Sequence, residues 1–382
     1  MELLEEMEYV GDIPEGWKWV KLGDEIELLY GKGLIEKERK NGIYPVYGSS
    51  GIIGYHNNYL VKGPGVIIGR KGSVGEVNLS KTDFYPIDTT YYLKLKNDND
   101  IFFFYYLLKT LRLNEINSHS AVPGLSREDI YSLYIPLPPL PEQKAIAEVL
   151  SSIDDKIELL HRQNKTLEKM AMTLFRQWFI EPTRDGLPEG WEEKKLKDVY
   201  IFEKGIEPGS KNYLETPSVD AIRFIRVGDM LDNKANVYIQ KDLVGNSICK
   251  FDDLLVSFDG TVGRVSFGIE GCYSSGIRKI YSEDEIYNKL WLKHQIFISE
   301  EIQDEINMYA EGTTILHASS SIDYLSFVLP PKEKIEEYDK FFDPIYKKIL
   351  HNKTQIQTLE KLRDILLPKL MSGEAKIMNN EQ

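Results

Sequence analysis

The sequence predicts an α+β fold in which two mixed α/β globular heads are joined by two long helices in an antiparallel coiled coil. Two observations predict it: an internal repeat that spans most of the chain, and two long segments with heptad spacing of apolar residues. The 382 residues suit two to three domains, and a hydrophobic content of 42% is enough to build folded cores.

The internal repeat is seen in three segments that return in the same order. Residues 13–17 (IPEGW) return at 187–191 as LPEGW, and Gly72–Gly75 (GSVG) returns as GTVG at 260–263 with a larger offset. Further on, TLEK at 166–169 returns at 358–361. The offset grows inside the heads and stays constant in the helices, which indicates loops that diverge on a shared scaffold.

Each head begins with a PEGW turn and continues through short β-branched and aromatic runs bounded by glycine. Strands are predicted at 66–68, 91–95, 223–227 and 254–256, and helices at 101–113 and 287–309. Mixed α and β heads follow from this pattern.

Residues 142 to about 179 contain no Gly or Pro, and apolar residues recur at alternating steps of four and three, so one long helix with a heptad seam is predicted. Asn164 in the seam either fixes the helix register or is a tolerated polar residue. The second copy has the same spacing, with Arg363 in the seam, but Pro344 and Pro368 predict a kink or a break near each. The seam residues are Ile146, Leu150, Ile153, Ile157, Leu160, Leu167, Leu174 and Trp178 in the first copy, and Tyr338, Phe342, Ile345, Ile349, Asn352, Ile356, Leu359, Leu366 and Leu370 in the second.

An exposed apolar seam of this length must find a partner, and the nearest one is the other copy. Antiparallel pairing of like units gives an approximate two-fold axis and places the heads at opposite ends of a rod. In the alternative arrangement, each helix packs only on its own head.

Composition restricts the function classes. The net charge of −13 argues against a simple DNA-coating protein, although local basic faces remain compatible with it. The two cysteines fit two buried thiols better than a disulfide, and without CxxC or HExxH patterns we expect no metal and no cofactor. The N-terminus lacks a signal pattern and no apolar run spans a bilayer, so a cytoplasmic protein without membrane contact is expected.

Three segments resemble type I restriction–modification DNA specificity subunits: PPLPEQKAIA at 138–147, LRDILLPKLMSG at 362–373, and YPVYG at 44–48. The resemblance implies a non-catalytic subunit in which each target-recognition domain reads one half of a bipartite site in double-stranded DNA. It implies helices that act as a ruler and dock two methyltransferase subunits, with restriction subunits completing the nuclease. The corresponding division is a first target-recognition domain at 1–140, a first spacer helix at 141–180, a second target-recognition domain at 181–331, and a second spacer helix and tail at 332–382.

Candidate DNA contacts are basic and hydroxyl side chains near Gly-rich turns, because such turns let the backbone approach phosphates while side chains reach base edges. Asp259 is unfavourable near phosphate but accepts a hydrogen bond from cytosine N4. The candidates in the first head are Lys32, Tyr47, Ser49, Ser50, Arg70, Lys71, Ser73, Ser118 and His119. Those in the second head are Lys204, Arg223, Arg226, Ser257, Asp259, Thr261, Arg278, Lys279, His317 and Ser319.

Each candidate also has a structural interpretation: the turns as ordinary hairpins, the surface cations as solvated groups, and Arg226 as half of an ion pair. Two other functions remain open. A self-sufficient DNA methyltransferase or nuclease is disfavoured because neither a P-loop nor an amino-methyltransferase N/D/S-P-P-Y/F/W motif occurs, although nuclease carboxylates are too degenerate to exclude. A coiled-coil adaptor with protein-binding heads fits the acidic charge.

Overall fold

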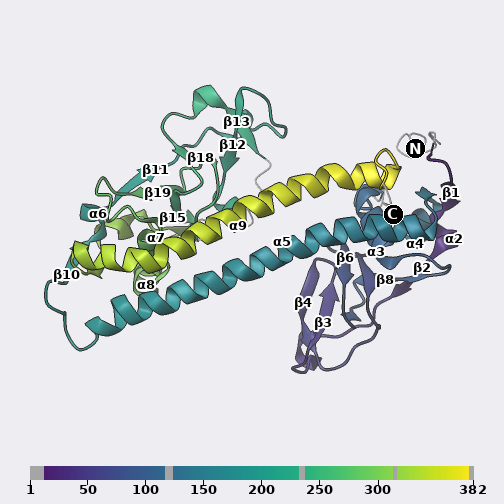
Figure 1. Cartoon of the computed structure of the whole chain (residues 1–382), viewed down its shortest axis with the longest axis horizontal. Helices are drawn as coiled ribbons and strands as arrows, with labels where there is room; N and C mark the ends of the chain where they lie inside the picture. The colour runs from purple at the N-terminus through teal and green to yellow at the C-terminus, as the bar shows by residue number, and fades with distance from the viewer. Residues whose placement is uncertain (1–12, 117–123, 232–236, 313–315, 378–382) are drawn as a thin grey trace, which may run out of the picture. The chain divides into compact units, whose positions relative to one another are not determined.

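A computed structural model describes residues 13–116, 124–231, 237–312 and 316–377 (Figure 1). The chain divides into two compact units, residues 1–157 with 358–382, and residues 158–357. The first unit holds the first head and the second unit holds the second head. Each long helix contributes one part to each unit.

The first long helix, α5, runs from Leu140 to Phe175 and continues as a π-helical turn, Arg176–Ile180, and a 3-10 turn, Glu181–Thr183. Pro141 lies in its first turn, where the missing N–H leaves no intrahelical bond unmade. At 36 residues, α5 is about 54 Å long. The predicted seam faces inward, because Ile146, Leu150 and Leu160 are all buried.

The second long helix, α9, is continuous from Lys332 to Ser372. The expected break at Pro344 or Pro368 is therefore wrong. A proline inside a helix removes one backbone hydrogen bond, but packing of neighbouring side chains compensates for that loss. Phe342 and Tyr346 are buried on either side of Pro344, and Leu370 is buried after Pro368.

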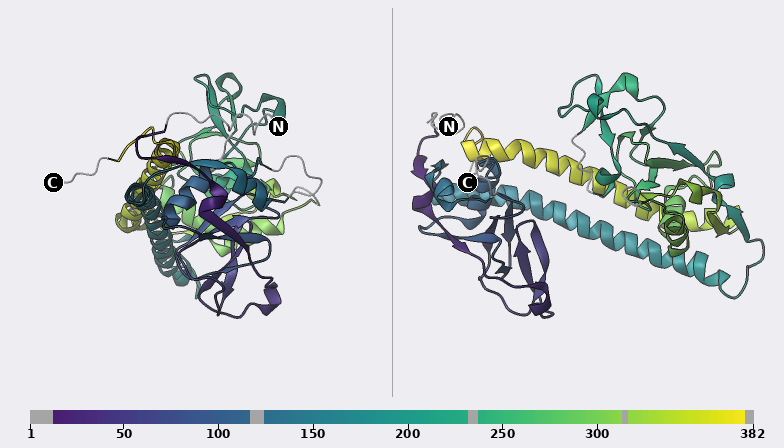
Figure 2. Two further views of the ribbon diagram at one scale, coloured as in Figure 1. Left: turned by 90° about the vertical axis from the view of Figure 1, so that its right-hand side faces the viewer. Right: turned by 180° about the vertical axis from the view of Figure 1, so that it is seen from behind.

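The two helices pair antiparallel within each unit. In the second unit, Asn352 Nδ2 donates to Asn164 Oδ1 over 2.8 Å, and the ring centroids of Phe342 and Phe175 are 6.5 Å apart. Moving forward along α5 thus means moving backward along α9 (Figure 2). In the first unit, the guanidinium of Arg363 donates to the carboxylate of Asp154 over 3.0 Å. Pairing of the copies is confirmed, and each helix does more than pack on its own head.

The first head is built around a four-stranded antiparallel sheet in the order β2-β8-β5-β6. A three-stranded sheet, β4-β3-β7, has β3 and β7 parallel, and β1 pairs with β9. The bounds are β1 Lys18–Lys21, α2 Leu22–Glu25, β2 Ile26–Tyr30, β3 Tyr44–Gly48, β4 Gly51–His56, β5 Gly65–Gly69, β6 Val77–Ser80, β7 Tyr85–Pro86, β8 Thr90–Leu95, α3 Ile101–Thr110, α4 Arg127–Ser132 and β9 Tyr134–Leu137.

The second head repeats this plan: the sheet β11-β19-β15-β17 corresponds to β2-β8-β5-β6, the pair β10-β21 corresponds to β1-β9, and β12 and β18 are parallel as β3 and β7 are. Its additional pair, β16-β20, joins two loops. The bounds are β10 Glu192–Lys195, α6 Leu196–Val199, β11 Ile201–Lys204, β12 Ala221–Ile225, β13 Tyr238–Gln240, β14 Ile248–Cys249, β15 Leu254–Ser257, β16 Asp259–Gly260, β17 Val265–Ser266, β18 Gly271–Tyr273, β19 Ile277–Tyr281, α7 Leu290–Ile298, α8 Glu300–Met308, β20 Leu316–His317 and β21 Ser326–Leu329.

The repeated PEGW segment forms the same turn in both heads. Gly16 and Gly190 have φ values of +89° and +78°, a conformation that glycine adopts without strain. The Trp17 indole N–H donates to Glu142 on α5 over 3.0 Å, so this turn attaches the start of the first head to its helix.

Several local predictions need correction. The helix expected at 287–309 is two helices, α7 and α8, because Ser299 between them has an extended backbone. Strand β12 ends at Ile225, so Arg226 lies outside it.

Cys249 and Cys272 are both free and buried, as expected for two thiols. Burial raises their pKa values to about 12 and about 11, respectively.

A buried polar cluster connects α7 to α9 in the second unit. His294 Nδ1 lies 2.6 Å from the Tyr346 hydroxyl, to which Gln295 Nε2 donates over 2.8 Å. Burial, with a smaller effect from the charge of Lys353, lowers the pKa of His294 to about 3. His294 is therefore neutral in the folded unit across the physiological range.

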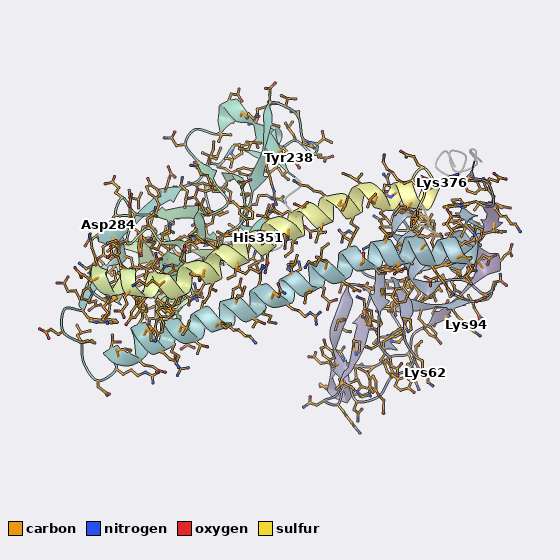
Figure 3. All side chains as sticks on the ribbon, viewed as in Figure 1. Lys62, Lys94, Tyr238, Asp284, His351 and Lys376 are labelled. Atoms are coloured by element: carbon orange, nitrogen blue, oxygen red, sulfur yellow. The ribbon has the colours of Figure 1, made fainter. Side chains whose placement is uncertain are left out.

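This buried histidine predicts acid sensitivity. An unfolded histidine takes up a proton near pH 6.5, whereas His294 in the folded protein does so near pH 3, so stability is lost as pH falls through this window. We expect the free energy of unfolding at pH 5 to be about 2 kcal/mol lower than at pH 7.5. Urea denaturation at both pH values measures it. H294Q should remove most of this difference, whereas H351Q, at an exposed position on α9 (Figure 3), should keep it.

Candidate nucleic-acid interface

The Gly-rich turns at 69–75 and 257–263 have the same backbone. The N–H of Gly75 donates to Gly69 O over 2.9 Å, and that of Gly263 donates to Ser257 O over 2.9 Å. The N–H of Gly69 likewise donates to Glu76 O, and that of Ser257 to Arg264 O. Gly72 and Gly75 in the first turn and Gly260 and Gly263 in the second have positive φ, between +77° and +82°. The two turns are one backbone structure with different side chains.

In the first head, strand pairing brings the turn at 69–75 next to the end of β2. Tyr30, the last residue of β2, pairs with Tyr91, and Gly69, the last residue of β5, pairs with Thr90. Both strand ends therefore flank the start of β8. Side chains that follow β2 and β5 in sequence gather at this one end of the sheet.

Arg70 lies against two adjoining aromatic rings at this sheet end. Its guanidinium lies 5.1 Å from the centroid of Tyr30 and 5.9 Å from that of Tyr91, and it donates to Asp88 O over 3.1 Å. The guanidinium of Arg127 also lies over the Tyr30 ring, 4.7 Å from its centroid. Stacking on rings orients a guanidinium plane and leaves edge donors available, the arrangement that recognises guanine or phosphate.

The other candidates of the first head differ in accessibility. Lys32, Ser50, Lys71 and Ser73 are exposed, and Ser49 is half-buried beside the turn. Tyr47 is buried and its hydroxyl donates to Leu79 O over 3.3 Å, so its position is one of core packing. Ser118 and His119 lie outside the described residues.

In the second head, four candidates from three separate segments form one cluster. Asp259 and His317 face each other across the β16-β20 pair, with Oδ1 and Nδ1 2.8 Å apart. The Arg278 guanidinium donates to the Ser319 hydroxyl over 2.8 Å and lies 3.9 Å from Asp259 Oδ2. Arg278 is buried and the Asp259 side chain is 22% exposed, whereas the His317 side chain is 64% exposed, so the cluster presents mainly its histidine outward.

Local partners occupy several other candidates of the second head. Arg226 forms a two-pronged ion pair with Asp229 over 2.9 and 3.1 Å, which is the structural role that its sequence context had suggested. Lys279 pairs with Glu203 over 2.7 Å. Buried Ser257 donates to Thr261 O and accepts from the Arg264 N–H, so it shapes the turn. Arg223 is half-buried, and Lys204 and Thr261 are exposed.

Sequence reasoning missed Tyr30 and Arg127. Tyr30 directly precedes Gly31, a repeated glycine, and its counterpart in the second head is Lys204, which was selected for its charge. That alignment could have indicated Tyr30. Nothing in the sequence around Arg127 could have indicated that it packs on the ring of a residue nearly a hundred positions earlier.

The model of the type I restriction modification DNA specificity domain matches the chain twice, at residues 14–169 and 188–361. The chain belongs to this family. Members supply DNA sequence specificity to restriction–modification complexes, so this specificity chain is a recognition component and is not catalytic by itself. The two matches coincide with the two copies of the internal repeat, and each contains a head and most of its following helix.

The specificity chain is similar to named specificity subunits over most of its length. The MjaIX specificity subunit of Methanocaldococcus jannaschii is 26% identical over 429 residues, covering 96% of this chain and 95% of the relative. The HindI specificity subunit of Haemophilus influenzae is 25% identical over 66% of this chain and 71% of its own length. A crystal structure of an S subunit from M. genitalium has a TM-score of 0.63 at 17% identity, covering 97% of this chain and 99% of that one, which shows the shared fold.

Two other kinds of feature are absent from the part of the chain that the structure describes. No group of three or more His, Cys, Asp or Glu residues there is arranged to hold a metal ion. None of its helices is long and apolar enough to cross a membrane.

Proposed function

We propose that the two heads read the two halves of a bipartite site in double-stranded DNA, while the paired helices α5 and α9 set the spacing between the halves. The functional division is then two target-recognition segments, 1–140 and 181–331, each followed by a spacer helix. The observation that supports this best is the pair of equivalent turns with unlike side chains.

The chemistry of the turns supports different sequence preferences for the two heads. Arg70, Lys71 and Arg127 give the first head a cationic sheet end with a stacked guanidinium, suited to guanine edges and phosphates. The second head has Phe258 and Asp259 at the matching positions, and its Asp259–His317 pair offers an acceptor suited to cytosine N4.

We further propose that methyltransferase subunits dock on the helices and that restriction subunits complete the nuclease. The chain carries a net charge of −13, and the cationic side chains that we assign to DNA are few. Neutralising the phosphates of a bipartite site requires many cations, so partners must supply most of these contacts. The isolated chain should therefore bind DNA weakly.

Selection of bound duplexes from a randomised pool tests the proposal. The chain assembled with its methyltransferase subunits should enrich two short conserved blocks separated by a constant, unread gap. Enrichment of one uninterrupted block, or the same enrichment by the methyltransferase without this chain, would contradict it. Protein-binding heads would give no enrichment at all.

A further inference from the structure

Two polar pairs interrupt the otherwise apolar seam between α5 and α9. Asn164 and Asn352 are 6% and 0% exposed, and their side-chain amides are joined by a 2.8 Å hydrogen bond. Asp154 and Arg363 are joined over 3.0 Å, with each side chain 25% exposed, and the second oxygen of Asp154 accepts from the Tyr106 hydroxyl over 2.7 Å. Each of the four side chains thus has a specific partner across the seam, although the Oδ1 atom of Asn352 itself is buried without a hydrogen bond.

Neither pair is conserved between the two copies of the repeat. In the alignment that matches Thr166 with Thr358, Asn164 corresponds to Ile356 and Asn352 corresponds to Leu160. Asp154 corresponds to Tyr346, and Arg363 corresponds to Ala171. All four of these counterparts are buried. The polar residues therefore distinguish two helices whose seams are otherwise alike.

This difference bears on which helices can pair. Because α5 and α9 are copies that pair antiparallel, the same register could join α5 of one chain to α5 of a second copy. Asn164 would then face Leu160, and Asp154 would face Ala171. In a pair of two α9 helices, Asn352 would face Ile356 and Arg363 would face Tyr346. Each such arrangement buries an asparagine without its hydrogen-bond partner, which is strongly unfavourable. It also breaks the Asp154–Arg363 ion pair, which leaves Asp154 with Tyr106 and Arg363 with Asp364.

We propose that Asn164–Asn352 and Asp154–Arg363 act as a pairing code that selects α5 with α9 and rejects like-with-like pairing with a second copy of this chain. Buried asparagines select partners in coiled coils in this way and lower stability in doing so. The code concerns the helices alone, so it holds whatever the heads bind.

The test replaces the asparagine pair by the residues of the other repeat, as N164I/N352L. Isotopically light and heavy chains are mixed in urea, refolded by dilution and cross-linked through lysines, and peptides are identified by mass spectrometry. A link from Lys156 of a light chain to Lys169 of a heavy chain reports α5 paired with α5. We expect about tenfold more of these links in N164I/N352L than in the original chain, together with a higher melting temperature.

Two further variants make the result specific. K165I/H351L places similar apolar side chains at the exposed positions beside the two asparagines, and it should give no increase in α5–α5 links. R363A installs the residue of the other repeat in the second pair, and it should increase mixed links between Lys347 and Lys361 of two α9 helices. Equal linking in the original chain and both code variants would overturn the proposal. So would a fall in melting temperature without new links, since the pairs would then only stabilise the chain.

Discussion

Inserting one heptad into both long helices will widen the gap between the two recognised half-sites by about three base pairs. Seven residues add about 10 Å to a helix, and DNA rises about 3.4 Å per base pair. The insertions belong after Ile157 in α5 and after Thr358 in α9. Both points lie between the Asp154–Arg363 pair and the Asn164–Asn352 pair, so both pairs survive and the seam stays in register.

Selection of bound duplexes by the assembled complex measures this change, and the half-site sequences should remain the same. The matched control inserts the heptad into α5 alone. This insertion misaligns one polar pair whenever the other is formed, so it should reduce stability and binding without producing a new gap. An unchanged gap in the doubly lengthened protein would mean that the helices do not set the spacing.

Reversing the charge of the turn at 69–75 will abolish recognition by the first head. R70E/K71E replaces two cations by carboxylates at the sheet end, where we place phosphate and guanine contacts. Losing such contacts costs about 1–3 kcal/mol each, so we expect binding by the assembled complex to weaken by about 100-fold or more. Electrophoretic mobility shifts or anisotropy titrations at constant salt measure the loss.

The matched control is K94E. Lys94 belongs to the same head and is exposed, but it lies toward the other end of β8 from the turn (Figure 3). Reversing the charge of Lys94 should change DNA binding less than about threefold, because it acts only through the long-range electrostatic field of the protein. Equal losses in both variants would show that net charge matters and the position of the turn does not. In the binding that remains, R70E/K71E should leave the sequence preference of the second head unchanged.

The repeat and the heptad spacing predicted the architecture because both are periodic properties that a single sequence displays. The same approach failed at Pro344 and Pro368, where tertiary packing on Phe342 and Leu370 keeps the helix intact despite an unfavourable local residue. It failed again at Ser299, where an apolar periodicity continues across a backbone that becomes extended.

The candidate site could be predicted only in part. The Gly-rich turns are marked by their glycines, and Arg70 and Asp259 lie within them, while His317 lies on β20 beside Asp259. Burial cannot be inferred from residue type, so the sequence indicates Tyr47 and Ser257 as candidate DNA contacts. In the structure, Tyr47 packs in the core, and Ser257 shapes the turn. Proximity across β16 and β20 depends on strand pairing that no local pattern encodes.

The turns at 69–75 and 257–263 are held by main-chain hydrogen bonds and by glycines, so exposed side chains such as Lys71, Ser73 and Thr261 contribute little to folding. Mutation can change those side chains with little penalty in stability. Under the proposed function, a lineage carrying this chain can therefore acquire new target sequences quickly while it retains the helices that we propose as docking surfaces. Exchanging a whole head between relatives would, under the same proposal, have this effect in one recombination event, because each head begins with the repeated PEGW segment.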